Sequence, residues 1–135
     1  MSAAEIFFDS NILLYLLSGD AAKADRAEQL LAGRGVISVQ VLNEVAAVAA
    51  GKFAMEIAEI RAVLAAIRAA CNVKPLDVAT HDLGLEIAER NRYSIYDSML
   101  LAAAICAGCS VFYSEAVQHG QTIDCLTIVN PFKEA

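Results

Sequence analysis

The chain alternates short apolar runs with longer segments in which apolar positions recur every three or four residues. The short runs predict strands, and the longer segments predict amphipathic helices. The strands are expected at 6–8, 35–38, 73–76, 110–113 and 126–129, and the helices at 10–17, 21–32, 39–50, 55–70, 80–90 and 95–107. Strands that alternate with helices favour an α/β fold with a mainly parallel sheet. No linker, repeat or low-complexity tract interrupts the pattern, so residues 1–135 are predicted to form one domain.

Acidic residues stand where these apolar segments end or turn polar. Asp9 directly follows the first strand, Glu44 lies on the helix after the second, and Asp97 lies in the first turn of the helix that leads into the fourth. Glu115 follows the fourth strand, next to Ser114. Sites in parallel sheets form beyond the carboxyl ends of the strands. The four acids are therefore expected to converge on one sheet edge.

Carboxylates beside a hydrophobic core are destabilising unless a cation meets them. Oxygen-only ligands suit Mg²⁺ or Mn²⁺, with several waters retained. The pattern therefore predicts a divalent metal site, with Asp9, Asp97 and Glu115 as metal ligands, Glu44 as a further catalytic acid, and Asn11 and Ser114 in support. A metal-activated water at such a site points to hydrolysis of a phosphodiester.

Each acid also has a structural interpretation. Asp9 is a good N-cap for the helix that follows it, although Ser10 offers the same function. Glu44 lies at the border of the apolar arc of its helix and can extend to solvent. Asp97 can close a capping box with Ser94, but it lies in the middle of the apolar arc, where a capping acid is unusual. Glu115 can belong to a surface turn.

Composition sets further limits. The chain is 58% hydrophobic, and its mean hydropathy is +0.51. Surface apolar groups in such excess indicate a subunit or partner interface. The longest weakly polar stretch, 99–113, is shorter than the roughly 20 residues that a membrane span requires. With no signal-peptide pattern at the N-terminus, we expect a soluble cytoplasmic protein without a membrane partner.

The formal charge of −6 argues against a nucleic-acid partner when it is taken alone. A metal bound among the acids weakens that objection, because the local field matters more than the total charge. The four cysteines include a C-x-x-C pair, Cys106 and Cys109, without a second pair. Buried, reduced cysteines are the simpler interpretation, and a zinc or redox role is the alternative.

Four segments together resemble the PIN-domain nucleases, and among them the VapC toxins of VapBC toxin–antitoxin pairs. They are the apolar run with Asp-Ser-Asn at 6–13, the helix start with Glu44 at 38–44, Tyr-Asp-Ser-Met-Leu-Leu at 96–101, and Tyr-Ser-Glu at 113–115. Any one of them is a weak signal, but their order, spacing and the length of the chain agree with the family.

The resemblance implies a three-layer α/β/α fold with a five-stranded parallel sheet, and a Mg²⁺- or Mn²⁺-dependent endoribonuclease that cuts RNA. Asp9, Glu44 and Asp97 match the first three acids of the family. It also implies a homodimer, and a VapB-like antitoxin protein whose C-terminal segment enters the acidic groove with a basic side chain.

The chain departs from the family at the fourth acid. After the serine or threonine that ends the fourth strand, the family has one variable residue and then Asp, whereas here Ser114 and Glu115 are followed by Ala116. Either Glu115 supplies the carboxylate, or the site lacks one ligand, as in a degenerate copy or a deliberate alanine substitution.

Two other functions compete with the nuclease. A non-catalytic PIN-fold module with an incomplete acid set would only dimerise and bind an antitoxin-like peptide, and Ala116 is the residue that favours it. A phosphatase-like enzyme would use Asp9 as a nucleophile, but it would ordinarily need a second Asp where this chain has Asn11.

Overall fold

A computed structural model describes residues 5–133. Residues 1–4 and 134–135 of the predicted domain lie outside this range. The elements in chain order are β1 (Ile6–Phe8), α1 (Ser10–Leu14), the 3₁₀ helix η1 (Tyr15–Leu17), α2 (Ala21–Ala32), β2 (Gly35–Ser38), α3 (Val39–Gly51), α4 (Ile57–Ala70), β3 (Cys71–Lys74), α5 (Val78–Asn91), α6 (Ile95–Cys106), β4 (Val111–Tyr113), β5 (Thr122–Ile123) and β6 (Leu126–Val129).

One sheet runs through the molecule in the strand order β3-β2-β1-β4-β6-β5. The first five strands in this order are parallel, and β5 pairs antiparallel with β6. Because β1 is central, the carboxyl ends of β2 and β4 lie on either side of its own carboxyl end. Residues that follow these three strands are therefore neighbours in space, although more than a hundred positions separate some of them in sequence.

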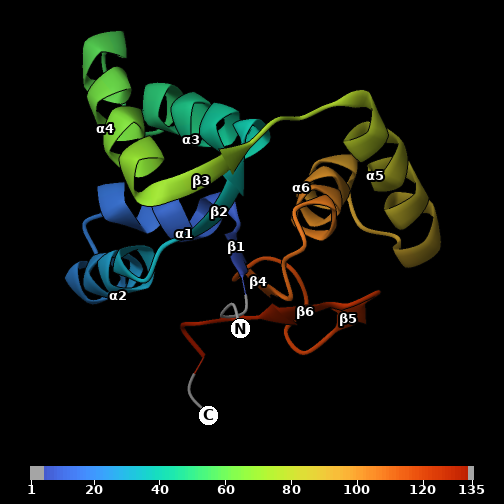
Figure 1. Cartoon of the computed structure of the whole chain (residues 1–135). Helices are drawn as coiled ribbons and strands as arrows, with labels where there is room; N and C mark the ends of the chain where they lie inside the picture. The colour runs from blue at the N-terminus through green and yellow to red at the C-terminus, as the bar shows by residue number, and fades with distance from the viewer. Residues whose placement is uncertain (1–4, 134–135) are drawn as a thin grey trace.

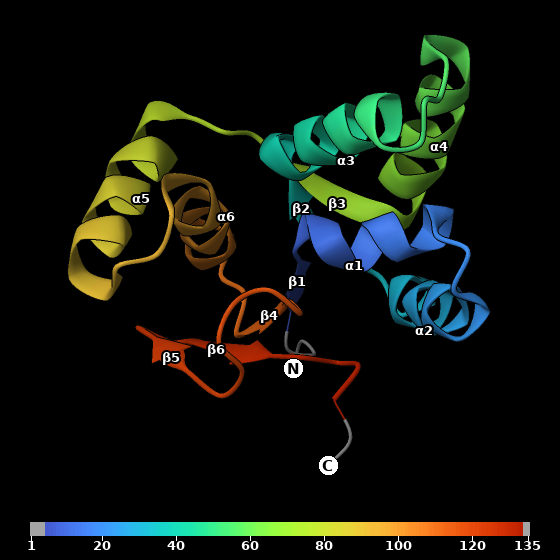
Figure 2. The ribbon, with the colours of Figure 1, turned by 180° about the vertical axis from the view of Figure 1, so that it is seen from behind.

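Helices cover both sides of the sheet. Helices α5 and α6 lie on one side, and α1 to α4 lie on the other (Figures 1 and 2). The predicted three-layer α/β/α architecture is confirmed. Among residues 5–133, no helix is long and apolar enough to cross a membrane.

The core forms where the central strands meet these helices. Phe7 of β1 and Phe112 of β4 are fully buried, and their rings stack with centroids 5.4 Å apart. On α6 every residue from 98 to 104 is buried, because the sheet covers one flank of the helix and α5 covers another. Burial of each large side chain contributes about 1.5–3 kcal/mol. The result is a rigid support for the ends of β1 and β4.

The sheet differs from the prediction in two places. It has a sixth strand, β5, whose two residues are too few to show a periodic pattern. The third strand begins at Cys71, directly after α4, and ends before Pro75, whereas the sequence favoured 73–76. Proline has no N–H for a strand ladder, and the polar Asn72 is tolerated because β3 is an edge strand.

Two helix starts also differ. Helix α4 begins at Ile57, after Glu56 and Glu59 close a capping box, rather than near Met55. Helix α5 begins at Val78, because the Asp77 side chain accepts a hydrogen bond from the Thr80 N–H and is the N-cap. The predicted start at position 80 is therefore too late, because Thr80 is the third helical residue.

Gly35 at the start of β2 provides a test of the packing between β1 and β2. A methyl group added there would lie 2.4 Å from a ring carbon of Phe8 and 2.9 Å from the Ile6 carbonyl oxygen. We expect Gly35→Ala to lower the free energy of unfolding by about 1–3 kcal/mol through overpacking. Gly51→Ala, with no atom within 4 Å of the added methyl, is the matched control and should not destabilise. Equal urea midpoints for the two variants would contradict this account.

Candidate active site

Three of the predicted acids come together at the carboxyl edge of the sheet. Asp9 follows β1, Glu44 lies on α3 and Asp97 lies in the first turn of α6. Ser10 links the first two, because its hydroxyl lies 2.7 Å from Glu44 Oε1 and 3.3 Å from Asp9 Oδ1. Asp97 and Glu44 both act electrostatically on Asp9. The convergence that the topology predicted is therefore present for Asp9, Glu44 and Asp97.

Asp9 is the buried centre of this group, with 3% of its surface exposed. It is the N-cap of α1, and its Oδ1 accepts a hydrogen bond of 2.6 Å from the Ser10 N–H. Its Oδ2 accepts from the Ser114 hydroxyl at 2.8 Å and from the Asn11 amide at 3.1 Å. Asp9 thus caps α1 and also lies at the centre of the acid group.

A count of protons shows where Asp9 can still accept a ligand. The Ser114 oxygen accepts from three N–H donors, those of Asn11, Ala116 and Val117, so its single proton points to Asp9. The Ser10 hydroxyl has one proton, and Glu44 is its nearer acceptor. Since each carboxylate oxygen accepts about two hydrogen bonds, Oδ2 is saturated and Oδ1 retains one free acceptor position.

Glu44 is held from two sides. Its Oε1 accepts from the Ser10 hydroxyl, and its Oε2 accepts from the Gln40 amide at 3.0 Å. Gln40 lies four residues earlier on α3, so the two side chains occupy the same face of the helix. Glu44 therefore points into the polar group rather than out to solvent.

Asp97 keeps its carboxylate free. The Ser94 hydroxyl caps α6 by accepting from the Asp97 N–H at 3.1 Å, as the sequence predicted. Within residues 5–133, however, no hydrogen-bond donor reaches the Asp97 carboxylate, so the reciprocal half of a capping box does not form. Its negative charge is available to act on Asp9.

These surroundings raise the pKa of Asp9 to about 6. Burial is the largest cause, because it disfavours the charged carboxylate, and the negative charges of Asp97 and Glu44 add to it. The hydrogen bonds from Ser114 and Ser10 act in the opposite direction and do not cancel the effect. A cation near Oδ1 would offset the cost of burying the negative charge and the repulsion from Asp97 and Glu44.

Glu115 lies apart from the other three acids. Its Oε1 accepts a hydrogen bond from the Tyr15 hydroxyl, and its Oε2 lies 2.9 Å from the ammonium group of Lys23 on α2. The hydrogen bond from Tyr15 is the main cause that holds the pKa of Glu115 below its usual range, and Lys23 adds to it. Each oxygen is engaged by one donor in this structure, so the expected metal-ligand role of Glu115 would compete with Lys23 and Tyr15.

Ala116 places an exposed methyl group beside Ser114. Its N–H donates to the Ser114 hydroxyl at 3.0 Å, and Ser114 in turn donates to Asp9. Position 116 is thus connected to the buried carboxylate through Ser114, and the Glu115 N–H is connected to it through Asn11. The Glu115 carboxylate is directed to Lys23, whereas Ala116 offers no carboxylate.

Several residues of the site escaped the sequence analysis. The spacing of four residues between Gln40 and Glu44 could have predicted their hydrogen bond, because residues four apart on a helix are neighbours. The Lys23–Glu115 pair is separated by 92 positions and gave none. Ser10 was considered only as a helix cap, and Ser38 as the end of the strand at 35–38. Ser38 is the N-cap of α3, but its hydroxyl makes no capping bond.

The donor set suits a hydrated Mg²⁺ or Mn²⁺ ion. Phe7 of β1 pairs with Val36 of β2, so two residues further along these parallel strands Ser38 lies beside Asp9. The Ser38 hydroxyl is fully buried and has no hydrogen-bond partner among residues 5–133. Such an orphaned hydroxyl is suited to a metal-bound water. Within the same residues, no three Asp, Glu, His or Cys side chains are close enough to hold one ion as a ready-made group. An ion bound here would therefore need waters to complete its set of ligands.

The cysteines take no part in this site. All four are free; Cys71 and Cys109 are buried, and Cys106 and Cys125 are exposed. Burial raises the pKa of the Cys71 and Cys109 thiols to about 11, which makes them poor nucleophiles. The interpretation as small buried residues therefore holds for two of the four.

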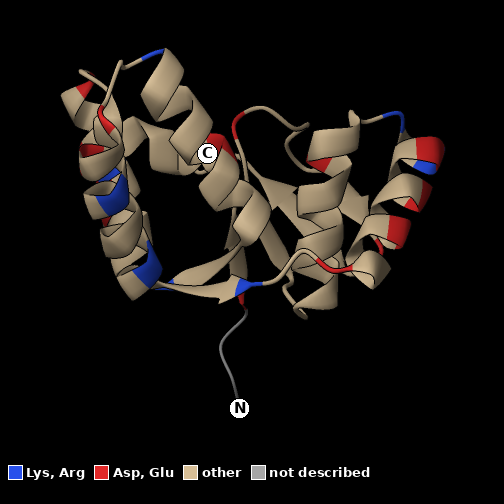
Figure 3. Ribbon diagram, turned by 90° about the horizontal axis from the view of Figure 1, so that it is seen from above, with Lys and Arg blue, Asp and Glu red and all other residues tan. Residues whose placement is uncertain are grey.

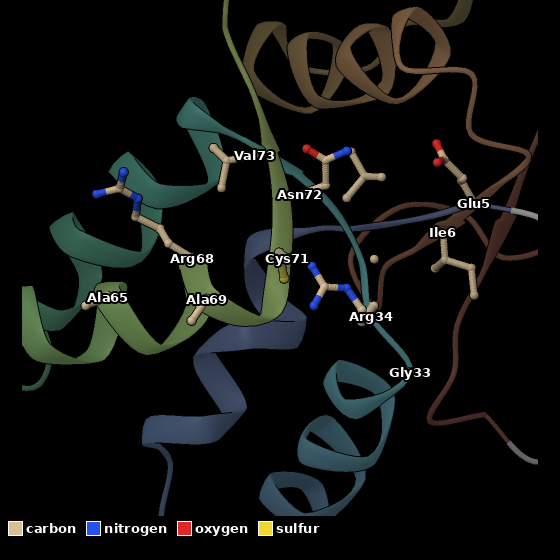
Figure 4. Close-up of a pocket in the computed structure, with 12 residues that line it drawn as sticks. Glu5, Ile6, Gly33, Arg34, Ala65, Arg68, Ala69, Cys71, Asn72 and Val73 are labelled. Atoms are coloured by element: carbon tan, nitrogen blue, oxygen red, sulfur yellow. The ribbon is translucent and has the colours of Figure 1, made fainter.

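A cavity of about 860 Å³ opens at the other end of the sheet, where β2 and β3 begin (Figure 4). Its lining includes Arg34, Arg68 and Cys71, and Glu5 is its one acidic lining residue. Because the acids described above lie beyond the carboxyl ends of the strands, this cavity is separate from the candidate active site.

Comparison with known proteins agrees with this architecture. Residues 6–117 match the family model described as PIN domain. A toxin–antitoxin complex from Klebsiella pneumoniae superposes with a TM-score of 0.71 at 21% identity, covering 96% of this chain and 100% of the other. DNA-bound VapBC from Salmonella typhimurium gives 0.67 at 18% identity, covering 93% and 97%.

The Mycobacterium tuberculosis toxin VapC20, described as cleaving the sarcin–ricin loop, gives a TM-score of 0.65 at 22% identity, covering 80% of this chain and 87% of the toxin. At these identities the likeness concerns the fold. No curated protein sequence matches the chain.

The raised pKa of Asp9 predicts how stability depends on pH without metal. Because the folded value is about 6 and the ordinary value is 3.8, the native protein binds more protons between these limits, and its stability falls as the pH rises through them. The decrease in the free energy of unfolding that is attributable to Asp9 is about 1–3 kcal/mol. Urea unfolding in EDTA at pH 4 and pH 7.5 should show this decrease in the unmodified chain but not in Asp9→Asn. An identical pH dependence in both proteins would contradict the assignment.

Proposed function

The chain belongs to the PIN domain family, and from this premise we propose that it is a metal-dependent endoribonuclease of the VapC toxin type. The observation that carries the proposal is the buried Asp9, which lies under repulsion from Asp97 and Glu44 and has a free acceptor position on Oδ1. A cation bound at Oδ1 would offset that electrostatic cost.

Asp9 would hold a Mg²⁺ or Mn²⁺ ion through Oδ1, with Asp97 and Glu44 binding it directly or through water. When bound, such an ion lowers the pKa of a coordinated water and polarises the phosphate of RNA. Ser114 and Asn11 keep the Asp9 carboxylate in one orientation through its Oδ2. Ser10 and Gln40 do the same for Glu44.

The proposal includes a VapB-like antitoxin that covers the acids with a basic side chain. The structures from Klebsiella and Salmonella are toxin–antitoxin complexes, which supports such a partner. Exposed apolar side chains, among them Val78 and Ile57, support a homodimer as well. The protein would act in the cytoplasm, where its RNA substrate is.

Position 116 decides between this function and a non-catalytic PIN module. The structure leaves Glu115 bound to Lys23 and Tyr15, which favours a site with one ligand fewer than the family pattern. An incomplete acid set of this kind is the observation that supports a module that only dimerises and binds an antitoxin-like peptide.

RNA cleavage with Mg²⁺ or Mn²⁺ tests the proposal in four proteins: the unmodified chain and its Ala116→Asp, Asp9→Ala and Glu115→Gln variants. We expect Ala116→Asp to cut faster than the unmodified chain, because it adds a carboxylate beside Ser114. Asp9→Ala should lose activity by on the order of 100-fold or more, since it removes the central ligand. EDTA should abolish cleavage in every case.

The Glu115→Gln variant separates the two accounts of the fourth acid. If it cuts as well as the unmodified chain, Glu115 serves Lys23 and Tyr15 rather than the metal. If it is as inactive as Asp9→Ala, Glu115 is the fourth ligand after all. Absence of cleavage by all four proteins, across varied RNAs and without antitoxin, would favour the non-catalytic module.

A further inference from the structure

Tyr96 differs from the other three tyrosines of the chain. Tyr15 bonds to Glu115, Tyr93 donates to Gln121, and the Tyr113 ring packs against Phe8. Tyr96 has 68% of its surface exposed, and within residues 5–133 it has neither a hydrogen bond nor an aromatic contact. Its ring is therefore available to another molecule.

Its position places that ring at the rim of the acid cluster. Tyr96 immediately precedes Asp97 in the first turn of α6, at the carboxyl edge of the sheet. Consecutive residues of a helix are about 100° apart around its axis. Asp97 acts on Asp9, so Tyr96 stands to one side of the acids rather than among them.

The exposure of the Tyr96 ring is unfavourable, because it leaves apolar surface in water, and the preceding residue is exposed as well. Ile95 is 50% exposed, so two large apolar side chains adjoin the site. Aromatic residues with one free face are enriched where proteins bind ligands. An aromatic ring beside carboxylates is suited to the flat face of a nucleobase, which carries no negative charge, whereas the RNA phosphates carry one each.

The distribution of charge makes such a contact useful. The chain has 10 basic and 16 acidic residues, and the basic residues are spread over the molecule rather than gathered in one patch (Figure 3). Lys74 ends β3 at the carboxyl edge of the sheet, and Lys23 is already paired with Glu115. Phosphate contacts therefore have no concentrated basic patch to use, and stacking does not depend on one.

We propose that Tyr96 stacks on an unpaired base of single-stranded RNA and holds the strand at the acid site. The inference rests on the proposed function and extends it by naming a subsite and the form of its substrate. Stacking requires a base that is free of its own stack, so loops and single strands are favoured over duplex. The base identity is not selected, because every base has a flat face.

RNA binding tests the proposal in the Asp9→Ala background, where cleavage does not interfere. The probe is a labelled single-stranded RNA of mixed sequence. Tyr96→Ala should weaken its binding by about 5- to 100-fold, the range that loss of one stacked base gives. Tyr96→Phe should bind like the parent, since it keeps the ring. The salt dependence of binding should not change, because no charge is removed.

Ile95→Ala is the matched control, since it removes an exposed apolar side chain from the neighbouring position. It should leave RNA affinity unchanged. A direct readout comes from Tyr96→Trp, because the chain contains no other tryptophan. Its fluorescence should be quenched by single-stranded RNA and not by duplex of the same length.

The outcomes separate this inference from the proposed function. If the parent binds RNA and Tyr96→Ala binds it equally well, the stacking subsite is wrong and the nuclease proposal stands. If Tyr96→Ala changes the molecular mass in solution but not RNA affinity, the ring belongs to an interface between copies, and the inference is again overturned. If the parent binds no RNA, the stacking inference falls, while the cleavage assay decides the nuclease proposal separately, because the parent lacks the Asp9 carboxylate.

Discussion

The burial of one carboxylate, Asp9, is the constraint on which the site depends. The central position of β1 puts it between two neighbouring strands, within electrostatic reach of Glu44 on α3 and Asp97 on α6. Ser114 and Asn11 fix one of its oxygens, while Asp97 and Glu44 raise its pKa by repulsion. The fold thus holds negative charges together at a cost in free energy, and a bound cation is the simplest compensation for that cost.

The same network connects both residues after Ser114 to the buried carboxylate. Ser114 donates its only proton to Asp9 and accepts the N–H of Ala116, while the Glu115 N–H donates to Asn11, which donates to Asp9. The Glu115 side chain instead joins α2 and η1 to the loop after β4 through Lys23 and Tyr15. Glu115 therefore stabilises the loop, and Ala116 leaves position 116 without a carboxylate.

Much of the fold follows from the sequence, because the strands that frame the site are uninterrupted apolar runs such as Ile6–Phe8. The convergence of Asp9, Glu44 and Asp97 follows from parallel topology alone. The two-residue strand β5 was missed because it is too short to show a period. The partner of Glu115 was missed because a contact between residues 92 positions apart leaves no local pattern. The sequence therefore predicted four converging acids, and the structure shows that three of them meet while Glu115 is bound by Lys23 and Tyr15.

The most direct test of the account is the pKa of Asp9 itself, measured by carboxyl NMR with and without Mg²⁺. The account predicts titration at about 6 in metal-free protein, because burial and the two neighbouring acids disfavour the charge. Saturating Mg²⁺ should lower that pKa, since the ion favours the charged carboxylate. An Asp9 that titrates at its ordinary value near 4 and does not respond to Mg²⁺ would contradict the claim that this cluster is a metal site.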